Sequence, residues 1–451
     1  MRTFPGLARA VVASCVAVVA FLQTVPASAA APVRTPADPR SVVQLRSDAD
    51  GRTWRGTMSI GFTNVDAAPL DDVYLRLWSN GVQGCDPLAI DVRDLTGGTA
   101  GPLAQRCTTL RIVLDQPVPE GGRGVVAFDL TIRVPLRNDR FGHVGGLSML
   151  GSALPVLAVH DDAGWNLPPF VDLGESFYSV AGTYRVTLNT PARLRTPTTG
   201  VRVARRTDDG RSISTFVARD VRDFEWAAGP LRRIVGEVGG TRVVVSSMPG
   251  GVGRSQAERM LAHAERSMRT FIRSFGPYPY GEVDVVLTGF ASFGGMEYPT
   301  FIFSNTNKLT IAHELAHQWW YGLVGNDQFS EPWLDEGLAT WSETLPWKPW
   351  RACGGIRWPS PGARMTNDMG YWRDHPNEYG TVVYRGAGCL FAQLADGFGL
   401  PRFLRIMERL GERYRYEVIR TQDLRRAIDR AADRHWPGFP ADFWTTWRVE
   451  P

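Results

Sequence analysis

Two histidines four positions apart, His313 and His317, are the residues of this sequence best suited to binding a metal ion. On a helix, positions i and i+4 lie on one face about a turn apart, so both imidazoles can reach one ion. Two imidazoles at this spacing favour Zn²⁺. Glu314 follows the first histidine and points beside the ion, where its carboxylate can hold a water molecule as general base. The pattern predicts a zinc-dependent hydrolytic site, and its alternative is a histidine pair on an ordinary amphipathic helix.

Glu336, nineteen positions after His317, is the candidate third ligand. The gap accommodates the end of the first helix, a loop around residues 325–332 and a second helix packed antiparallel to the first. Two histidines and one glutamate leave the fourth tetrahedral position to water, as in catalytic zinc sites. Glu343 lies seven positions after Glu336 on the same helix face. We expect it either to orient a ligand histidine or to be a solvated acid.

The elements that must position these groups lie in residues 241–451, where strand and helix patterns alternate. Ser255 and Glu258 form a capping-box pattern that predicts a helix start, and Gly276 with Pro277 predicts the end of that helix. A strand is expected over residues 282–287. Helical spacing returns from residue 384 to residue 447. We interpret this half of the chain as one α+β domain.

Residues 31–240 show mostly β patterns. Alternating or β-branched runs are separated by turn-forming clusters at roughly regular spacing, as in a β sandwich or a saddle-like β domain. The predicted strands cover residues 57–65, 73–78, 110–114, 125–134, 184–188 and 215–218. The whole chain is therefore predicted to be α+β, with a β domain followed by a mixed α/β domain that carries the zinc site.

Two motifs give the sequence a family resemblance. Residues 313–343 read HELAHQWWYGLVGNDQFSEPWLDEGLATWSE and closely resemble the aminopeptidase N and leukotriene hydrolase type of zinc peptidase, the M1 family of gluzincins. Upstream, residues 294–299 read GGMEYP and resemble the family's G-x-M-E-N exopeptidase motif. The resemblance implies a thermolysin-like zinc peptidase domain over residues 241–451. It is looser over residues 31–240, which would be the family's N-terminal saddle domain.

The resemblance assigns roles to the motif residues. His313, His317 and Glu336 match the ligands of one zinc ion, and Glu314 matches the general base. Tyr384, in the sequence VYRG, matches the family tyrosine that hydrogen-bonds the oxyanion of the tetrahedral intermediate.

Other positions match groups that bind substrate. Glu297 matches the acid that binds the free α-amino group of the substrate. Gly294, Gly295 and Met296 match the strand that lines the substrate peptide, and Tyr379 matches a second family tyrosine.

The sequence also departs from the family pattern. Asp335 replaces the usual Asn before the ligand glutamate, and Tyr298 replaces the Asn after Glu297. We find no acidic or amide motif in the N-terminal half for the second contact that the family makes to the substrate amine. The family's large C-terminal helical domain is also missing, so we expect a more open site with a less restricted substrate length.

Residues 1–30 have the pattern of a secretory signal. Arg2 and Arg9 precede an apolar run over residues 10–22, and a small-residue site predicts cleavage near Ala29 and Ala30. The run is too short to favour a transmembrane helix, although an uncleaved anchor is an alternative. No later stretch predicts a membrane span. The protein is therefore expected to be secreted.

The cysteine count agrees with export. Beyond the predicted signal there are four cysteines, and an even number in an exported chain suggests two disulfides. Pairing sequence neighbours gives Cys85–Cys107 and Cys353–Cys389, one of three connectivities, with free buried thiols as the alternative. The net charge of +4 is too small to indicate a nucleic-acid partner.

These observations predict a secreted zinc aminopeptidase that hydrolyses the N-terminal peptide bond of peptides and carries one Zn²⁺ per chain. One alternative is a zinc peptidase of broader or endopeptidic specificity. Another is an inactive, zinc-containing peptide-binding module, which would need neither Glu314 nor Tyr384. Epoxide hydrolysis, known in one branch of the family, would require carboxylate-binding basic residues that the sequence does not reveal. We favour a monomer, although the sequence leaves the oligomeric state and the preferred first residue open.

Overall fold

The computed structural model describes residues 33–290, 292–348, 350, 353 and 355–450. Residues from Val33 onward form one compact unit. The predicted signal segment, including Ala29 and Ala30, lies outside the described residues. Within the described ranges, every helix is too short or too polar to cross a bilayer.

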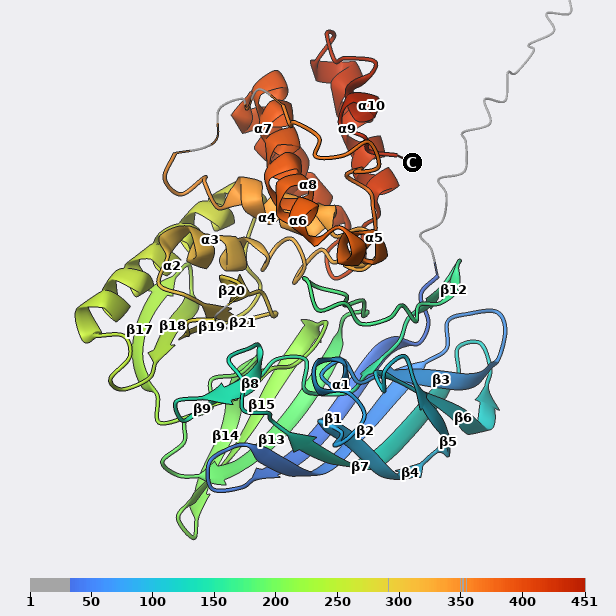
Figure 1. Ribbon diagram of the computed structural model, residues 1–451, viewed down its shortest axis with the longest axis vertical. Helices are drawn as coiled ribbons and strands as arrows, with labels where there is room; N and C mark the ends of the chain where they lie inside the picture. The colour runs from blue at the N-terminus through green and yellow to red at the C-terminus, as the bar shows by residue number, and fades with distance from the viewer. Residues whose placement is uncertain (1–32, 291, 349, 351–352, 354, 451) are drawn as a thin grey trace, which may run out of the picture. The chain divides into compact units, whose positions relative to one another are not determined.

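A seven-stranded sheet dominates the N-terminal half (Figure 1). Its strands, in sheet order, are β14 (Val201–Asp208), β15 (Arg211–Val221), β13 (Gly182–Pro191), β1 (Ala37–Ser47), β2 (Thr53–Thr63), β7 (Arg123–Arg133) and β4 (Ile90–Thr96). Strand β1 is central in this sheet, and it runs parallel to β13 and antiparallel to β2. Its side chains alternate, with Val43 and Leu45 buried and Val42 exposed, so one face of the sheet is solvated.

Smaller sheets cover the buried face of this large sheet. Their strands are β10 (Val156–Leu157), β3 (Leu70–Arg76), β6 (Thr109–Val118) and β5 (Gly98–Ala104) in one sheet, β16 (Trp226–Ala228), β9 (Leu147–Leu150) and β8 (Phe141–Val144) in another, and the pair β11 (His160–Asp161) and β12 (Gly164–Trp165). One hydrophobic core joins the two larger sheets, with Met58 and Phe128 on one side and Leu75 and Ile112 on the other. The predicted β domain is confirmed, and each predicted strand overlaps an observed one.

A short helix, α1 (Asn80–Gln83), lies beside the first disulfide. Its Asn80 side chain donates to the carbonyl oxygens of Ile90 and Cys107. Cys107 is bonded to Cys85, with 5.6 Å between the two Cα atoms. This is the pairing that the sequence neighbours predicted.

The second half is built on a five-stranded sheet. Its order is β17 (Arg232–Val238), β18 (Thr241–Ser247), β19 (Glu282–Leu287), β21 (Phe301–Ser304) and β20 (Gly295–Met296). The three middle strands are parallel, and both edge strands pair antiparallel to their neighbours. The hairpin of β17 and β18 crosses the predicted domain boundary at residue 240. The boundary itself stays a prediction, because the chain from Val33 onward is one compact unit.

Helix α2 (Arg254–Phe275) packs against β17 and β18 (Figure 1). The predicted capping box is wrong: Gly253 is the N-cap residue, and Ser255 lies one position inside the helix without a capping bond. Glu258 instead pairs with Arg254 at 2.8 Å, four residues away on the same face. The predicted end is confirmed, because Gly276 has a φ of 93° that favours glycine.

The remaining residues form the helices that surround the site. They are α3 (Lys308–Ala316), α4 (Trp333–Ser342), α5 (Met369–Asp374), α6 (Pro376–Tyr379), the π-helix η1 (Gly380–Gly386), α7 (Ala387–Phe398), α8 (Leu400–Arg413), α9 (Thr421–His435) and α10 (Phe443–Thr446). Cys389 on α7 is bonded to Cys353, with 5.7 Å between the Cα atoms. This arrangement of a β domain and a mixed α/β domain confirms the predicted α+β class.

Candidate metal centre and active site

Helices α3 and α4 bring the three predicted ligands to one point. His313 lies near the end of α3, His317 ends that helix, and Glu336 lies in the first turn of α4. The two histidine Nε2 atoms are 3.1 Å apart, and Glu336 Oε2 lies 3.1 Å from the first and 3.5 Å from the second. Donor atoms of all three residues therefore surround one small space.

The outer ring nitrogens of both histidines are engaged. His313 Nδ1 lies 2.9 Å from Glu343 Oε2, and His317 Nδ1 lies 3.0 Å from the carbonyl oxygen of Trp320. Proton donation from Nδ1 to these acceptors would leave each Nε2 to bind a metal ion, as in zinc sites where carboxylates and carbonyls orient the ligands. Two imidazoles and one carboxylate form a donor set that fits Zn²⁺.

The charges of these groups also fit a cation site. Burial opposes protonation of His317, but its hydrogen bond to Glu336 raises the pKa of the imidazole to about 10. The pKa of Glu336 moves the other way: burial is outweighed by hydrogen bonds from both histidines, which hold it well below its usual value. The space between the ligands thus favours positive charge, and a metal ion bound there would displace protons.

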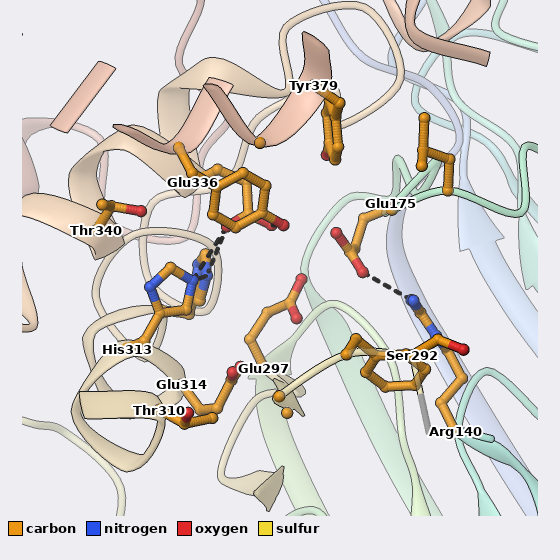
Figure 2. Close-up of a pocket in the computed structure, with 18 of the residues that line it drawn as sticks. Arg140, Glu175, Ser292, Glu297, Thr310, His313, Glu314, Glu336, Thr340 and Tyr379 are labelled. Carbon is orange, nitrogen blue, oxygen red and sulfur yellow. Dashed lines mark hydrogen bonds and ion pairs between the residues drawn. The ribbon is translucent and has the colours of Figure 1, made fainter. Parts of the chain in front are cut away.

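Glu314 faces the same cavity from α3 without belonging to the ligand set (Figure 2). Burial raises the pKa of its carboxyl group to about 8. The backbone of Gly295 on β20 packs directly against it. A Cβ atom at Gly295 would lie 2.5 Å from Glu314 Oε1 and 2.6 Å from Cδ. Only glycine leaves room for the carboxylate in this orientation.

The G-G-M-E segment divides its residues between the cavity and the core. Gly294 and Gly295 line the cavity, as the family resemblance implied. Met296 is fully buried among aromatic side chains, and its side chain is not among those that line the cavity. The strand therefore presents glycine backbone to the cavity.

Glu297 follows on the same segment and is almost fully buried. It accepts a hydrogen bond from Gln328 Nε2 at 3.0 Å, and the same amide group donates to Asp335 Oδ2 at 2.7 Å. Asn326 donates to the other oxygen of Asp335 at 2.8 Å. The departure of Asp335 from the family pattern thus has a local cause: the carboxylate accepts from two side-chain amides. Sequence spacing did not reveal Gln328 as the link between Asp335 and Glu297.

The N-terminal domain supplies the acid that the sequence analysis did not find. Glu175, in the segment between β12 and β13, lines the cavity and has a carboxylate oxygen within 4.8 Å of oxygens of Glu297 and Glu336. Arg140 Nη1 donates to Glu175 Oε1 at 2.8 Å (Figure 2). Burial raises the pKa of Glu175 to about 7, although Arg140 lowers it. No motif in the N-terminal half had marked Glu175, which the structure places at the cavity.

Two tyrosines reach the cavity from the π-helix region. The hydroxyl group of Tyr384 donates to Glu336 Oε1 at 2.8 Å, and its ring stacks on His313 with centroids 5.9 Å apart. Tyr379 lies five residues earlier, and its ring is 5.5 Å from that of Tyr384. The wider π turn places both rings in the same cavity. Helix α4 packs closely on α7 at Gly337, where an added Cβ would lie 2.4 Å from Ala387 Cβ. The lack of a side chain at Gly337 thus lets the two helices approach.

The cavity has a volume of about 810 Å³ and is lined from both halves of the chain. Five of its lining residues are glutamates: Glu175, Glu297, Glu314, Glu336 and Glu343. Their carboxylates favour a cationic group close to the ligand set.

Sequence comparison links part of this domain to a known family. Residues 259–350 match the family described as the Peptidase family M1 domain. This part of the chain is similar to the M1 family of peptidases. Curated M1-type relatives include aminopeptidase M1-B of Oryza sativa subsp. japonica, 26% identical over 242 residues, which cover 46% of this chain and 27% of that protein. Leucine aminopeptidase 2 of Aspergillus fumigatus is 35% identical over 113 residues, which cover 23% of this chain and 18% of that protein.

The chain thus spans about a quarter or less of the length of these curated relatives. Solved structures match it more completely. The M1 zinc metallopeptidase of Deinococcus radiodurans gives a TM-score of 0.61 at 17% identity, over 92% of this chain and 93% of that one. A mutant of that peptidase bound to a Tyr-Ser-Ala substrate gives 0.62 at 18% identity, over 91% and 93%. At these identities the likeness establishes a shared fold.

Proposed function

We propose that this protein is an M1-type, zinc-dependent aminopeptidase that hydrolyses the N-terminal peptide bond of peptides. The observation that carries the proposal is the pair of buried carboxylates, Glu297 and Glu175, next to the zinc-ligand set. The pair reaches the cavity from two different domains. A free α-amino group carries a positive charge that these two carboxylates can bind. A peptide bond inside a polypeptide chain is uncharged and offers them no such group.

His313, His317 and Glu336 would hold the zinc ion, which when bound lowers the pKa of a water molecule and polarises the scissile carbonyl group. Glu314 accepts the proton of the attacking water and passes it to the leaving amine.

Tyr384 is proposed as the donor to the developing oxyanion. Its hydroxyl group already points at the ligand set, since it donates to Glu336. A single preorganised donor of this kind contributes about 2.7–4 kcal/mol to transition-state stabilisation in other hydrolases.

Glu297 and Glu175 would fix the substrate amine. Two ionised carboxylates this close and this deeply buried repel each other. A cation between or beside them offsets that repulsion. Arg140 donates to one oxygen of Glu175. Glu297 and Glu175 both still line the cavity. An ammonium group there would be bound by both acids, which places the first peptide bond of the substrate at the ligand set.

Export and metal content extend the same proposal. We propose that residues 1–30 direct secretion with cleavage near Ala29 and Ala30, supported by the two disulfides, since these persist in oxidising compartments. We also propose one zinc ion per chain. N-terminal sequencing of protein recovered from the culture medium, and metal analysis of that protein, test these two points.

The decisive experiment uses paired substrates that differ only in the N-terminus: aminoacyl-peptides with a free amine and their N-acetylated forms. Wild-type protein should cleave the free-amine member, lose activity with a chelator and regain it with zinc. Glu297→Gln should remove most of that preference, whereas Glu258→Gln, on the exposed face of α2, should retain it. Equal cleavage of both members by wild-type protein would contradict the exopeptidase assignment and favour a broader peptidase. Glu314→Gln should keep zinc and lose activity, and substantial activity in that variant would contradict the mechanism.

A further inference from the structure

Three arginines line the otherwise acidic cavity, and they differ in their partners. Arg137 pairs with Asp139, and Arg140 pairs with Glu175. Arg385 is exposed and, among the described residues, makes no hydrogen bond or ion pair. It is therefore the lining arginine whose guanidinium is available to a ligand.

Arg385 lies close in sequence to Gly388, which packs against the part of the cavity wall formed by Thr340 and Trp350. It follows Tyr384 in η1 and precedes Gly388 on α7 by three residues, about one turn. Gly388 packs against two further lining residues: a Cβ there would lie 2.9 Å from Thr340 Cγ2 and 3.0 Å from Trp350 Cζ3. Arg385, Thr340 and Trp350 all line the same cavity.

This wall lies away from the acid pair. Thr340 is one turn beyond Glu336 on α4, and Figure 2 shows Thr340 and Glu175 on opposite sides of Glu336. The direction of the substrate rests on the function proposed above: with its amine at Glu297 and Glu175 and its first carbonyl group at the ligand set, the chain continues towards Thr340 and Arg385.

We propose that Arg385, with Thr340 and Trp350 as walls, forms a subsite for a carboxylate on the residue that follows the scissile bond. The charges in the cavity support this placement. Four glutamates (Glu175, Glu297, Glu314 and Glu336) lie at or beside the acid pair and the ligand set, where they repel a substrate anion. Glu343 lies at this end too, but one of its oxygens is held by His313 at 2.9 Å. A short peptide with an ammonium at one end and a carboxylate beyond the scissile bond thus matches both ends of the cavity.

That carboxylate has two sources: the C-terminus of a dipeptide, or an Asp or Glu side chain in a longer peptide. Four substrates separate them: Leu-Ala, Leu-Ala-amide, Leu-Asp-amide and Leu-Asn-amide. For wild-type protein we expect kcat/KM to be about three- to tenfold higher for the carboxylate member of at least one pair, as for a partly exposed charged hydrogen bond. The pair that shows the preference identifies the source.

Variants and salt connect the preference to Arg385. Arg385→Gln should bring the ratio of kcat/KM within each pair close to one, and Arg385→Lys should retain part of it. Arg405→Gln, an exposed arginine on α8 that does not line the cavity, should keep the wild-type ratio. Raising the salt concentration of wild-type assays should lower the ratio, because salt screens exposed charges.

The outcomes are distinguishable. If wild-type protein cleaves both members of both pairs equally, the carboxylate subsite is wrong and the aminopeptidase proposal stands. A preference that survives in Arg385→Gln also overturns the subsite. If wild-type protein cleaves none of the four free-amine substrates, the proposed function itself fails. Should Arg385→Gln be inactive, the ratio in Arg385→Lys and the salt dependence of wild-type protein decide.

Discussion

Replacing Gly295 with alanine should disable the general base without touching the metal ligands. The new Cβ atom would lie 2.5 Å from Glu314 Oε1 and 2.6 Å from both Cγ and Cδ of the same side chain. Gly295 is in a regular strand without a positive φ, so its backbone accepts alanine. The three atoms nearest to the new Cβ all belong to Glu314.

The magnitude follows from the overlap. Carbon atoms that are not bonded rest at about 3.5–4.0 Å, so the Glu314 carboxylate must move by about 1 Å. Displacing a catalytic group by about that distance costs roughly a hundredfold in rate, or about 2.7 kcal/mol of transition-state stabilisation. We therefore expect kcat to fall about a hundredfold while zinc stays bound.

The assay is steady-state kinetics on a short free-amine substrate, together with zinc analysis of the same preparation. Gly289→Ala is the matched control, because a Cβ there meets nothing within 4 Å and the residue does not line the cavity. It should retain wild-type kinetics. If Gly295→Ala keeps kcat within about threefold of wild type with zinc bound, the position of Glu314 does not limit catalysis and the reasoning is wrong.

Three further predictions concern individual side chains. Glu343→Ala should weaken zinc binding about 10–100-fold in a chelator competition, since it removes the acceptor of His313 Nδ1, and an unchanged affinity would refute its orienting role. Tyr384→Phe should lower kcat about 10²–10³-fold with zinc retained, whereas a change confined to KM would remove the oxyanion role. Burial raises the pKa of Asp223 in the N-terminal domain to about 6. The folded state then binds this proton more tightly than the unfolded state, so stability falls as the pH rises from about 4 to about 6. Asp223→Asn should gain on the order of 3 kcal/mol relative to wild type over that range in urea denaturation, and parallel pH curves for the two proteins would contradict this.

The clustering of His313, His317 and Glu336 could be predicted because its geometry is local. Two histidines one turn apart share a helix face in any helix, and one short loop returns the chain to place Glu336 beside them. The same spacing placed Glu343 on the correct face, where it contacts His313. These positions depend on helix geometry more than on the tertiary fold.

Glu175 could not be predicted in this way. It lies 122 positions before Glu297 (297 − 175) in a segment without regular strand or helix structure, so no periodicity marks it. Only the packing of two domains brings it to the cavity. The contact between Gly295 and Glu314 is similar, because a close approach across strand and helix leaves no trace in local spacing.

Element boundaries show a third kind of limit. The sequence of Ser255 and Glu258 satisfies a capping box, yet the N-cap is Gly253, two residues earlier, and Glu258 pairs with Arg254. Strand β14 was not predicted because all eight of its residues are exposed, so burial imposes no alternation on them. Solvated elements give weaker patterns than buried ones.

The central position of β1 has a consequence for synthesis of the chain. Ser47 ends β1 and Gly182 begins its parallel partner β13, so the 134 residues between them must be made first. At about 5–20 residues per second, one edge of β1 waits roughly 7–30 s for its partner. Through that interval the strand exposes unpaired backbone groups beside apolar side chains, which other chains can bind. Glu175 lies just before β13 in sequence. We therefore expect Glu175 and the end of the cavity that it lines to be ordered only when β13 pairs with β1 and completes the sheet.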